Sequence, residues 1–269
     1  MPIEVNGEIR RFSQDEFYEV DYAVMGVIFD VHNRFGRFLD EYLYKVEIAA
    51  RCAGRGILPA VRELRIRVSH DTFAKDFFLD MLFCRGAMYE AKTVEHLAPA
   101  HRAQTLNYLF LCDLQHGKLV NLRPDRVQAE FVSTTLDCKS RRQFEIHDSE
   151  WRNVNNESLL LRRQMIELLE DWGGFLEVAL YRDAITHFHG GPEAVSRNVE
   201  VYSGDRLIGR QAVHLLTDDT AFAISAVTEP LSMREHQLRF LRHTRLKYVQ
   251  WINLNRHAIE FRTLGEAHV

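Results

Sequence analysis

Hydrophobic and polar residues alternate along the chain with two different periods, which predict where helices and strands lie. From residue 15 to 34, apolar side chains recur at helical spacing and predict an amphipathic helix. A second helix is expected over 41–53, ahead of two glycines, and a third over 99–114, with Pro99 in its first turn. Short apolar runs predict strands at 63–68, 77–83, 87–92, 118–122 and 129–132.

Two of these strands, Phe77–Phe83 and Ala87–Lys92, are separated by only three residues, Cys84–Gly86. This spacing predicts a β-hairpin, and the glycine is expected to supply the backbone freedom that the reversal requires. Side chains two residues apart on a strand point to the same face. Glu90 and Lys92 should therefore share a face, with Asp80 opposite them on the partner strand.

Two carboxylates and an ammonium group are unusual on an otherwise apolar hairpin, because charged groups are costly to remove from water unless they are compensated. A divalent cation held by Asp80 and Glu90, with Lys92 beside it, would provide that compensation. Oxygen ligands of this kind suit Mg²⁺ or Mn²⁺. The alternatives are an exposed acid at Asp80 and a structural salt bridge between Glu90 and Lys92.

Asp80 followed by Glu90-Ala91-Lys92 resembles the motif of the PD-(D/E)XK nuclease superfamily. Phe35–Tyr44 resembles the glycine-to-ExxY signature of the GxxExxY family, and His101–Leu109 and Val120–Leu122 resemble the helix and strand that follow its lysine. The resemblance covers residues 20–135. One position departs from the pattern, since Phe38 stands where a glycine is expected three residues before Glu41.

The resemblance implies an α/β (α+β) fold with a restriction-endonuclease-like αβββαβ core, in which helices flank a mixed sheet. It also implies that Asp80, Glu90, the carbonyl of Ala91 and the additional acid Glu41 form the metal site. Lys92 would orient or help to deprotonate the attacking water and offset charge in the transition state. Gln104 would lie next to this lysine.

Further candidates could contact a nucleic-acid backbone. His101 and Tyr108 share a helix face with Gln104, although an aromatic residue at this spacing also suits a hydrophobic core. A basic stripe that includes Arg239, Arg242 and Arg245 is expected on a helix over 234–247. Such a stripe suits binding along a phosphate backbone, and a solvated helix face is the alternative.

Composition narrows the class of protein. The chain has 269 residues, 46% of them hydrophobic, and a formal net charge of −4, which does not suggest a general nucleic-acid coat protein. Its four cysteines show no CxxC spacing, so reduced thiols in the cytoplasm are expected. No leader-like segment and no apolar run of membrane-spanning length is evident, so no membrane association is expected.

The second half of the chain repeats features of the first. Trp172–Tyr181 aligns with Phe35–Tyr44, and later segments recur in the same order, which predicts a tandem duplication. We expect a nuclease-like domain at 1–135, a connection at 136–156 and a second domain at 157–269. A helix-strand rhythm common to all α/β segments is the alternative.

The second copy lacks the chemical residues of the first. The alignment places His214 at the position of Asp80, Ile224 at that of Glu90 and Ala226 at that of Lys92, while Glu177 is a candidate replacement for Glu41. We therefore expect the second copy to be catalytically inactive and to provide structural support.

The expected function is metal-dependent hydrolysis of phosphodiester bonds in nucleic acid, with DNA as the substrate. The alternative is an inactive nucleic-acid-binding or scaffolding module with a nuclease fold. The chain is expected to act as a monomer with pseudo-dimeric halves or as a subunit of a larger complex.

Overall fold

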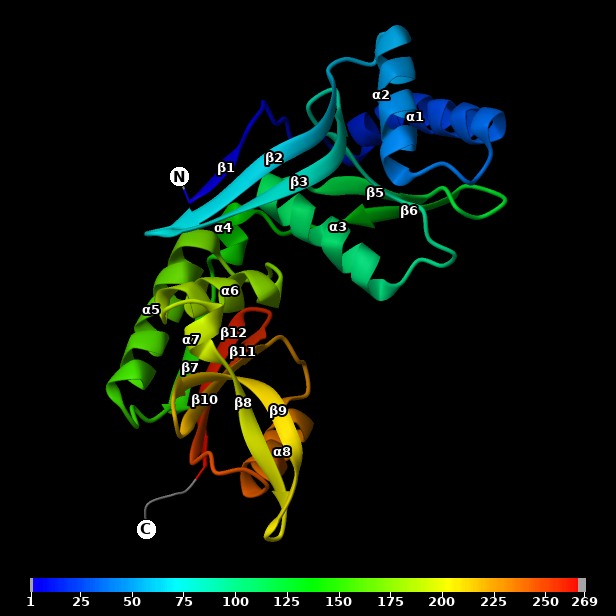
Figure 1. Cartoon of the computed structure of the whole chain (residues 1–269). Helices are drawn as coiled ribbons and strands as arrows, with labels where there is room; N and C mark the ends of the chain where they lie inside the picture. Colours follow the sequence, from blue (N-terminus) through cyan, green and yellow to red (C-terminus); the bar gives the residue numbers. More distant parts are fainter. Residues whose placement is uncertain (1, 266–269) are drawn as a thin grey trace. The chain divides into compact units, whose positions relative to one another are not determined.

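A computed structural model of the chain describes residues 2–265, which form two compact units. Of the described residues, unit 1 comprises 2–69 and 74–140, and unit 2 comprises 70–73 and 141–265. Apart from His70–Phe73, the chain passes from unit 1 to unit 2 between Ser140 and Arg141. Each unit contains one six-stranded mixed sheet with helices against it (Figure 1), so the expected α/β class is confirmed.

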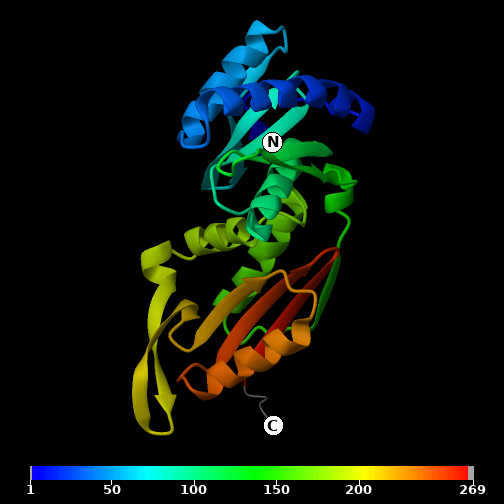
Figure 2. The ribbon, with the colours of Figure 1, turned by 90° about the vertical axis from the view of Figure 1, so that its right-hand side faces the viewer.

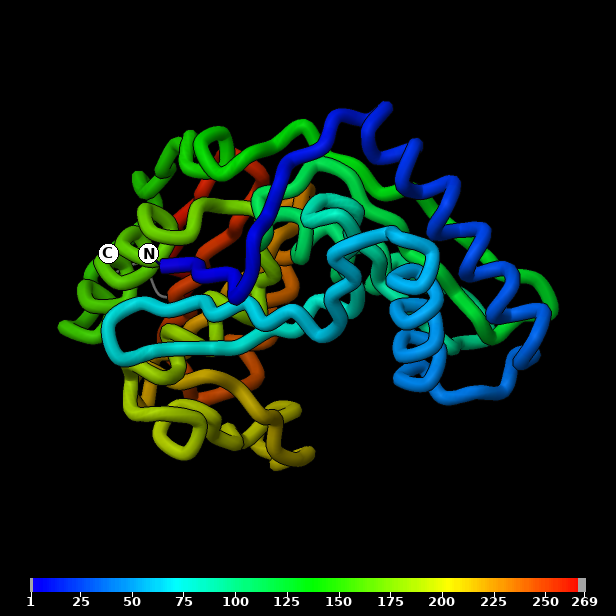
Figure 3. The backbone as a smooth tube through the Cα atoms, turned by 90° about the horizontal axis from the view of Figure 1, so that it is seen from above, coloured from blue at the N-terminus to red at the C-terminus, as the bar shows by residue number. Residues whose placement is uncertain are grey.

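The sheet of unit 1 has the strand order β1-β2-β3-β4-β5-β6. Strands β4 and β5 pair in parallel through the crossover helix α3, whereas β3–β4 and β5–β6 are antiparallel. Strands β2 and β3 form one long hairpin (Figure 3). The elements are β1 (Ile3–Val5), α1 (Gln14–Phe35), α2 (Glu41–Gly54), β2 (Ala60–His70), β3 (Phe73–Phe83), β4 (Ala87–Lys92), α3 (Pro99–Cys112), β5 (His116–Asn121), β6 (Gln128–Ser133) and α4 (Cys138–Arg141).

Helices α1 and α2 cover one face of this sheet and bury its main core. Helix α1 begins with a capping box, in which the Ser13 side chain accepts from the backbone of Glu16 and the Glu16 side chain accepts from the backbone of Ser13. Its apolar stripe packs against alternate residues of β4, including Tyr89 and Ala91. Glu90 and Lys92 consequently lie on the other face of the sheet, as the period of two predicts.

The turn between β3 and β4 confirms the expected hairpin but uses its residues differently. Cys84 and Arg85, with φ of 52° and 67°, adopt the left-handed conformation, so Gly86 does not supply the reversal as expected. Gly86 is required by packing instead, because a Cβ at this position would lie 2.5 Å from the carbonyl oxygen of Arg10 and 2.6 Å from the Phe12 ring.

Unit 2 repeats the order of five of these six strands, whereas its first strand, β7, lies at the opposite edge of the sheet, beside β12. Strands β8 to β12 lie in sequence order across the sheet with the same pairing directions as β2 to β6, including the parallel pair β10–β11 (Figure 2). The elements are β7 (Glu145–Glu150), α5 (Asn156–Trp172), α6 (Val178–Phe188), α7 (Pro192–Val195), β8 (Ser196–Ser203), β9 (Arg206–Thr217), β10 (Thr220–Ser225), α8 (Pro230–Arg242), β11 (Tyr248–Asn255) and β12 (Ala258–Gly265).

Two features of the described residues differ from the expectations. Strand β7, within the supposed connection, pairs in parallel with β12 and so belongs to the second sheet. Helix α8 ends at Arg242, so the basic stripe does not continue on one helix to Lys247.

No helix between residues 2 and 265 is long and apolar enough to span a membrane.

Candidate active site

The hairpin β3–β4 brings Asp80 and Glu90 together. The antiparallel register ends with Met81 opposite Tyr89, and one step further the Asp80 Oδ2 atom accepts a hydrogen bond from the backbone NH of Ala91 at 2.9 Å. Both carboxylates are buried, Asp80 with 6% and Glu90 with 1% of its surface exposed. The adjacency predicted from the sequence is therefore confirmed, and each acid lies in the electric field of the other.

The two oxygens of Glu90 have different environments. Oε1 accepts a hydrogen bond from the Lys92 ammonium group at 2.7 Å, whereas Oε2 is buried without a hydrogen-bond partner. Burial and the neighbouring charges of Asp80 and Glu41 raise the pKa of Glu90 to about 8, despite the opposing charge of Lys92. In the metal-free protein this carboxyl group is therefore mainly protonated below about pH 8.

Lys45 is a member of the site that the sequence reasoning missed. It lies on α2 with 6% of its surface exposed, and its Nζ is 2.7 Å from Asp80 Oδ1, 2.5 Å from Glu63 Oε1 and 3.5 Å from Glu41 Oε1. Burial opposes the charge on this ammonium group, but the hydrogen bonds to Asp80 and Glu63 outweigh it and raise the pKa of Lys45. Lys45 follows Glu41 by one helical turn, and this spacing in the sequence indicates that the two side chains lie on the same face of the helix.

Glu41 is the first residue of α2, and its orientation depends on the preceding turn. The Tyr44 hydroxyl group donates a hydrogen bond to the carbonyl oxygen of Gly36, and the Gly36 NH bonds to the His32 carbonyl at 2.9 Å. Gly36 has a φ of 71°, which favours glycine. The spacing from Gly36 to Tyr44 thus reflects a fixed corner between α1 and α2, which directs Glu41 and Lys45 towards the sheet.

Helix α3 places its candidates in unequal environments. Gln104 is exposed. The Nδ1 atom of His101 accepts a hydrogen bond from the backbone NH of Ala98 at 2.9 Å, so this side chain caps the start of the helix. Tyr108 is only 7% exposed, so its ring belongs to the core and offers little surface for a phosphate contact. Among Gln104, His101 and Tyr108, the side chain of Gln104 is therefore the most accessible to a substrate.

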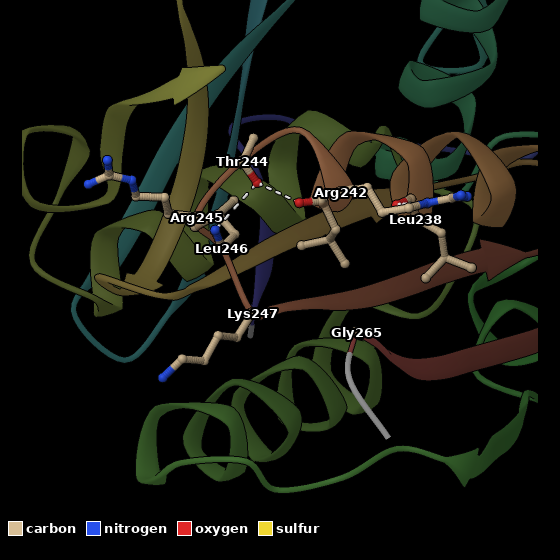
Figure 4. A pocket seen from close by; sticks show the side chains of 8 residues that line it. Leu238, Arg242, Thr244, Arg245, Leu246, Lys247 and Gly265 are labelled. Carbon is tan, nitrogen blue, oxygen red and sulfur yellow. Dashed lines mark hydrogen bonds between the residues drawn. The ribbon is translucent and has the colours of Figure 1, made fainter. Parts of the chain in front are cut away.

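Two of the three basic candidates of unit 2 line a cavity of about 620 Å³ at the end of α8. Arg242 and Arg245 line it and extend towards opposite ends of the view in Figure 4. The Arg245 guanidinium group lies over the Tyr202 ring, 5.2 Å from its centre, and Arg239 Nη2 lies 3.7 Å from Glu235 Oε2. These exposed cations therefore form a dispersed basic surface, not one continuous stripe.

The ligands present at the hairpin are suited to a hard divalent cation. Asp80 and Glu90 offer carboxylate oxygens, and the unpartnered Oε2 of Glu90 has capacity for one more bond. Within residues 2–265, no group of three or more His, Cys, Asp or Glu side chains is arranged to hold a metal ion. A cation here would thus need the Ala91 carbonyl group and water in addition to the two acids.

A family model described as the PD-(D/E)XK nuclease superfamily matches residues 18–133, the segment that contains this hairpin and the helices around it. The mixed sheet flanked by helices agrees with a nuclease-like fold of that superfamily. Comparisons with curated proteins and with solved structures find no match.

Hydrogen bonds that recur in unit 2 identify the counterparts of the site residues. Asn121, opposite Lys92 in β5, bonds through its side chain to both the NH and the carbonyl group of Val94. Asn253, opposite Ser225 in β11, bonds in the same way to Val227. Ser225 therefore occupies the position of Lys92, and Ala223, two residues earlier, that of Glu90.

These equivalences correct the alignment made from sequence by one residue. Ile224 and Ala226 are not the counterparts of Glu90 and Lys92. His214 pairs with Phe222 as Met81 pairs with Tyr89, so the residue before it, Val213, corresponds to Asp80.

The corner before α6 supplies the remaining counterparts. The Tyr181 hydroxyl group donates to the Gly173 carbonyl oxygen as Tyr44 does to Gly36, an offset of 137 residues. At this offset, Val178 corresponds to Glu41, so Glu177 is not its replacement. Arg182 corresponds to Lys45. The counterparts of Glu41, Asp80 and Glu90 thus have no carboxylate, while a cation is retained.

Proposed function

We propose that unit 1 hydrolyses phosphodiester bonds in nucleic acid, with DNA as the expected substrate, at a site formed by Asp80, Glu90 and Lys92. The observation that supports this most strongly is the buried Glu90 carboxylate, with one oxygen bonded to Lys92 and the other without a partner. A buried, unpartnered polar atom is costly and often marks a site that is completed by a ligand.

Asp80, Glu90 and the Ala91 carbonyl group, with Glu41 as an additional acid, would hold Mg²⁺ or Mn²⁺. Such a cation lowers the pKa of water and polarises the scissile phosphate when it is bound. Lys92 can orient the attacking water and offset the negative charge that develops on the phosphate. Lys45 holds Asp80 in position through their 2.7 Å ion pair. Gln104 is proposed to act beside Lys92, and His101 stays a predicted phosphate contact. Tyr108 is buried and takes the core role that the sequence also allowed.

We further propose that the chain belongs to the GxxExxY subfamily as a tandem duplication with a degenerate second copy. The shared strand order and the recurring Tyr–Gly and Asn–Val hydrogen bonds support this proposal. In a symmetric dimer, both subunits contribute the same surface to the interface. A fused second copy can supply that contact within one chain, which is consistent with a monomer of pseudo-dimeric halves or with a subunit of a larger complex. A cytoplasmic location stays a prediction.

Cleavage assays with Glu90→Gln test the proposed activity. The purified chain is incubated with single-stranded and double-stranded DNA and with RNA, with and without Mg²⁺ or Mn²⁺. We expect cation-dependent cleavage that falls at least a hundredfold in Glu90→Gln and in Lys92→Met, and losses that do not add in the double variant. Glu19→Gln, an exposed glutamate variant on α1, is the matched control and should retain the parent rate.

Equal cleavage by the parent and by Glu90→Gln would contradict the assignment. One observation favours a second function, a nucleic-acid-binding or scaffolding module without turnover: the Lys45 ammonium group already compensates Asp80 and Glu63 without a metal. In that case the parent would bind nucleic acid but cleave none of these substrates with either cation.

A further inference from the structure

The equivalent of the active site in unit 2 is a cavity of about 280 Å³ between the sheet, α6 and α8. Its lining includes Arg182, Val213 and Ala223, the counterparts of Lys45, Asp80 and Glu90. The position of the site is therefore preserved as an accessible hollow, although its acids are replaced by apolar residues.

This replacement reverses the charge that the hollow presents. In unit 1, the Lys45 ammonium group is neutralised by Asp80, Glu63 and Glu41. In unit 2, the counterparts of Asp80 and Glu41 are Val213 and Val178, and among residues 2–265 no carboxylate forms a salt bridge with Arg182. The nearby Asp183 carboxylate acts electrostatically on His214. A guanidinium group at the edge of an apolar hollow binds oxyanions well, because its planar N–H groups match the geometry of phosphate and carboxylate oxygens.

Two further polar side chains line the same hollow. Burial and the charge of Arg182 lower the pKa of His214, although the negative charge of Asp183 opposes this shift. The neutral ring, which is thereby favoured, has one donor and one acceptor nitrogen. The Gln237 Oε1 atom is buried without a hydrogen-bond partner. A rotation of this amide group exchanges its oxygen and nitrogen, so it can present either an acceptor or a donor to a ligand.

The remaining walls are apolar and include Phe222 and Phe240. The His214 ring packs against Phe222, with 5.4 Å between ring centres, which restrains the histidine beside the opening. Aromatic walls beside a cation suit a ligand that combines a phosphate with a flat, apolar group, as nucleotides do.

We propose that this hollow is a phosphate-binding site of unit 2, in which Arg182 binds the phosphate group of a nucleotide, free or within a nucleic-acid strand. The acids that are proposed to hold a cation in unit 1 have apolar counterparts in this hollow. The proposal does not require cleavage by unit 1, because none of the residues involved belongs to the Asp80–Glu90 hairpin.

Calorimetric titrations of the full-length chain with inorganic phosphate, AMP and adenosine, and fluorescence anisotropy with a labelled single-stranded DNA, test the proposal in EDTA. We expect AMP or the DNA to bind, adenosine not to bind, and Arg182→Met to weaken the binding at least tenfold. Arg182→Lys should retain part of the affinity. Arg206→Met, at an exposed position of β9, is the control and should bind as the parent does.

The ligands also distinguish the source of the phosphate. Binding of AMP and phosphate would identify a free nucleotide as the ligand, whereas binding of the DNA alone would identify a nucleic-acid strand. Failure of all phosphate-containing ligands to bind would overturn the proposal, as would equal affinities of the parent and a folded Arg182→Met. Thermal unfolding of each variant verifies that it is folded. Because EDTA removes divalent cations, these titrations report binding without cation-dependent cleavage, which separates this result from the test of cleavage.

Discussion

The Lys45 ammonium group lies 2.7 Å from the Asp80 carboxylate, inside the candidate active site. Lys45 also contacts Glu63 and Glu41, so one buried cation links the acids of α2, β2 and β3. The site therefore contains its own counter-charge, and a divalent cation would share Asp80 with this ammonium group.

Lys45→Met should destabilise the metal-free protein, because Asp80 would be left as a buried charge without its partner. We expect the free energy of unfolding to fall by about 3 kcal/mol in urea titrations with EDTA. Mg²⁺ should restore more stability to this variant than to the parent, since the cation would replace the missing positive charge.

Two controls accompany this experiment. Lys139→Met removes an exposed lysine and should leave stability unchanged. The double variant Lys45→Met/Asp80→Asn should be more stable than Lys45→Met alone, because the second substitution removes the negative charge that Lys45 balances in the parent. A Lys45→Met variant as stable as the parent would mean that the ion pair contributes nothing to folding.

The stability of the metal-free protein should depend on pH through Glu90. Its pKa is raised from 4.5 to about 8 in the folded state, so the folded protein holds a proton that the unfolded chain releases. The contribution to stability is fully present below pH 4.5 and is lost as the pH rises to about 8. The free energy of unfolding should fall by up to about 1.4 kcal/mol for each unit of pH in this range.

Urea titrations between pH 4 and 9 in EDTA measure this dependence, and Glu90→Gln should reduce the slope. Glu19→Gln should keep the parent profile. The apparent affinity for Mg²⁺ should rise with pH over the same range, because the cation competes with the proton on Glu90. An identical pH profile for the parent and Glu90→Gln would contradict the raised pKa.

Tyr44→Phe and Tyr181→Phe should have similar effects in the two units. Each removes a hydroxyl group that bonds to a glycine carbonyl oxygen at the corner before a helix. Because both tyrosines are fully buried, we expect a loss of about 1–2 kcal/mol in each variant, measured by urea unfolding. Tyr22→Phe, at an exposed position of α1, should have no effect. A large loss in only one unit would argue against equivalent corners.

Replacing Arg239, Arg242 and Arg245 together with glutamine should weaken nucleic-acid binding and reduce its dependence on salt concentration. The slope of log K against log[salt] should decrease by about 0.9 for each phosphate of duplex DNA that the variant no longer neutralises. Fluorescence anisotropy at several salt concentrations measures this slope, and Arg163→Gln on α5 is the control. Unchanged affinity at every salt concentration would exclude a role for this basic surface.

Local sequence patterns were sufficient to predict most helices and strands and part of the candidate active site. The strand period of two placed Glu90 and Lys92 on one face, and a short turn brought Asp80 beside them, since both relationships involve residues close in the chain. The Gly36–Tyr44 spacing and its repeat at Gly173–Tyr181 were likewise visible in the sequence, because a fixed corner requires a fixed number of residues.

Only the tertiary structure decided which distant residues complete each site. Lys45 precedes Asp80 by 35 residues and reaches it because α2 packs against the sheet. The one-residue correction at Ala223 and Ser225 came from the pairing of β10 with β11, which no local pattern specifies. The burial of Tyr108 likewise depends on what surrounds α3. Sequence periodicity determines which face of its own element a side chain occupies, whereas the packing of separate elements determines which side chains and charges that face meets.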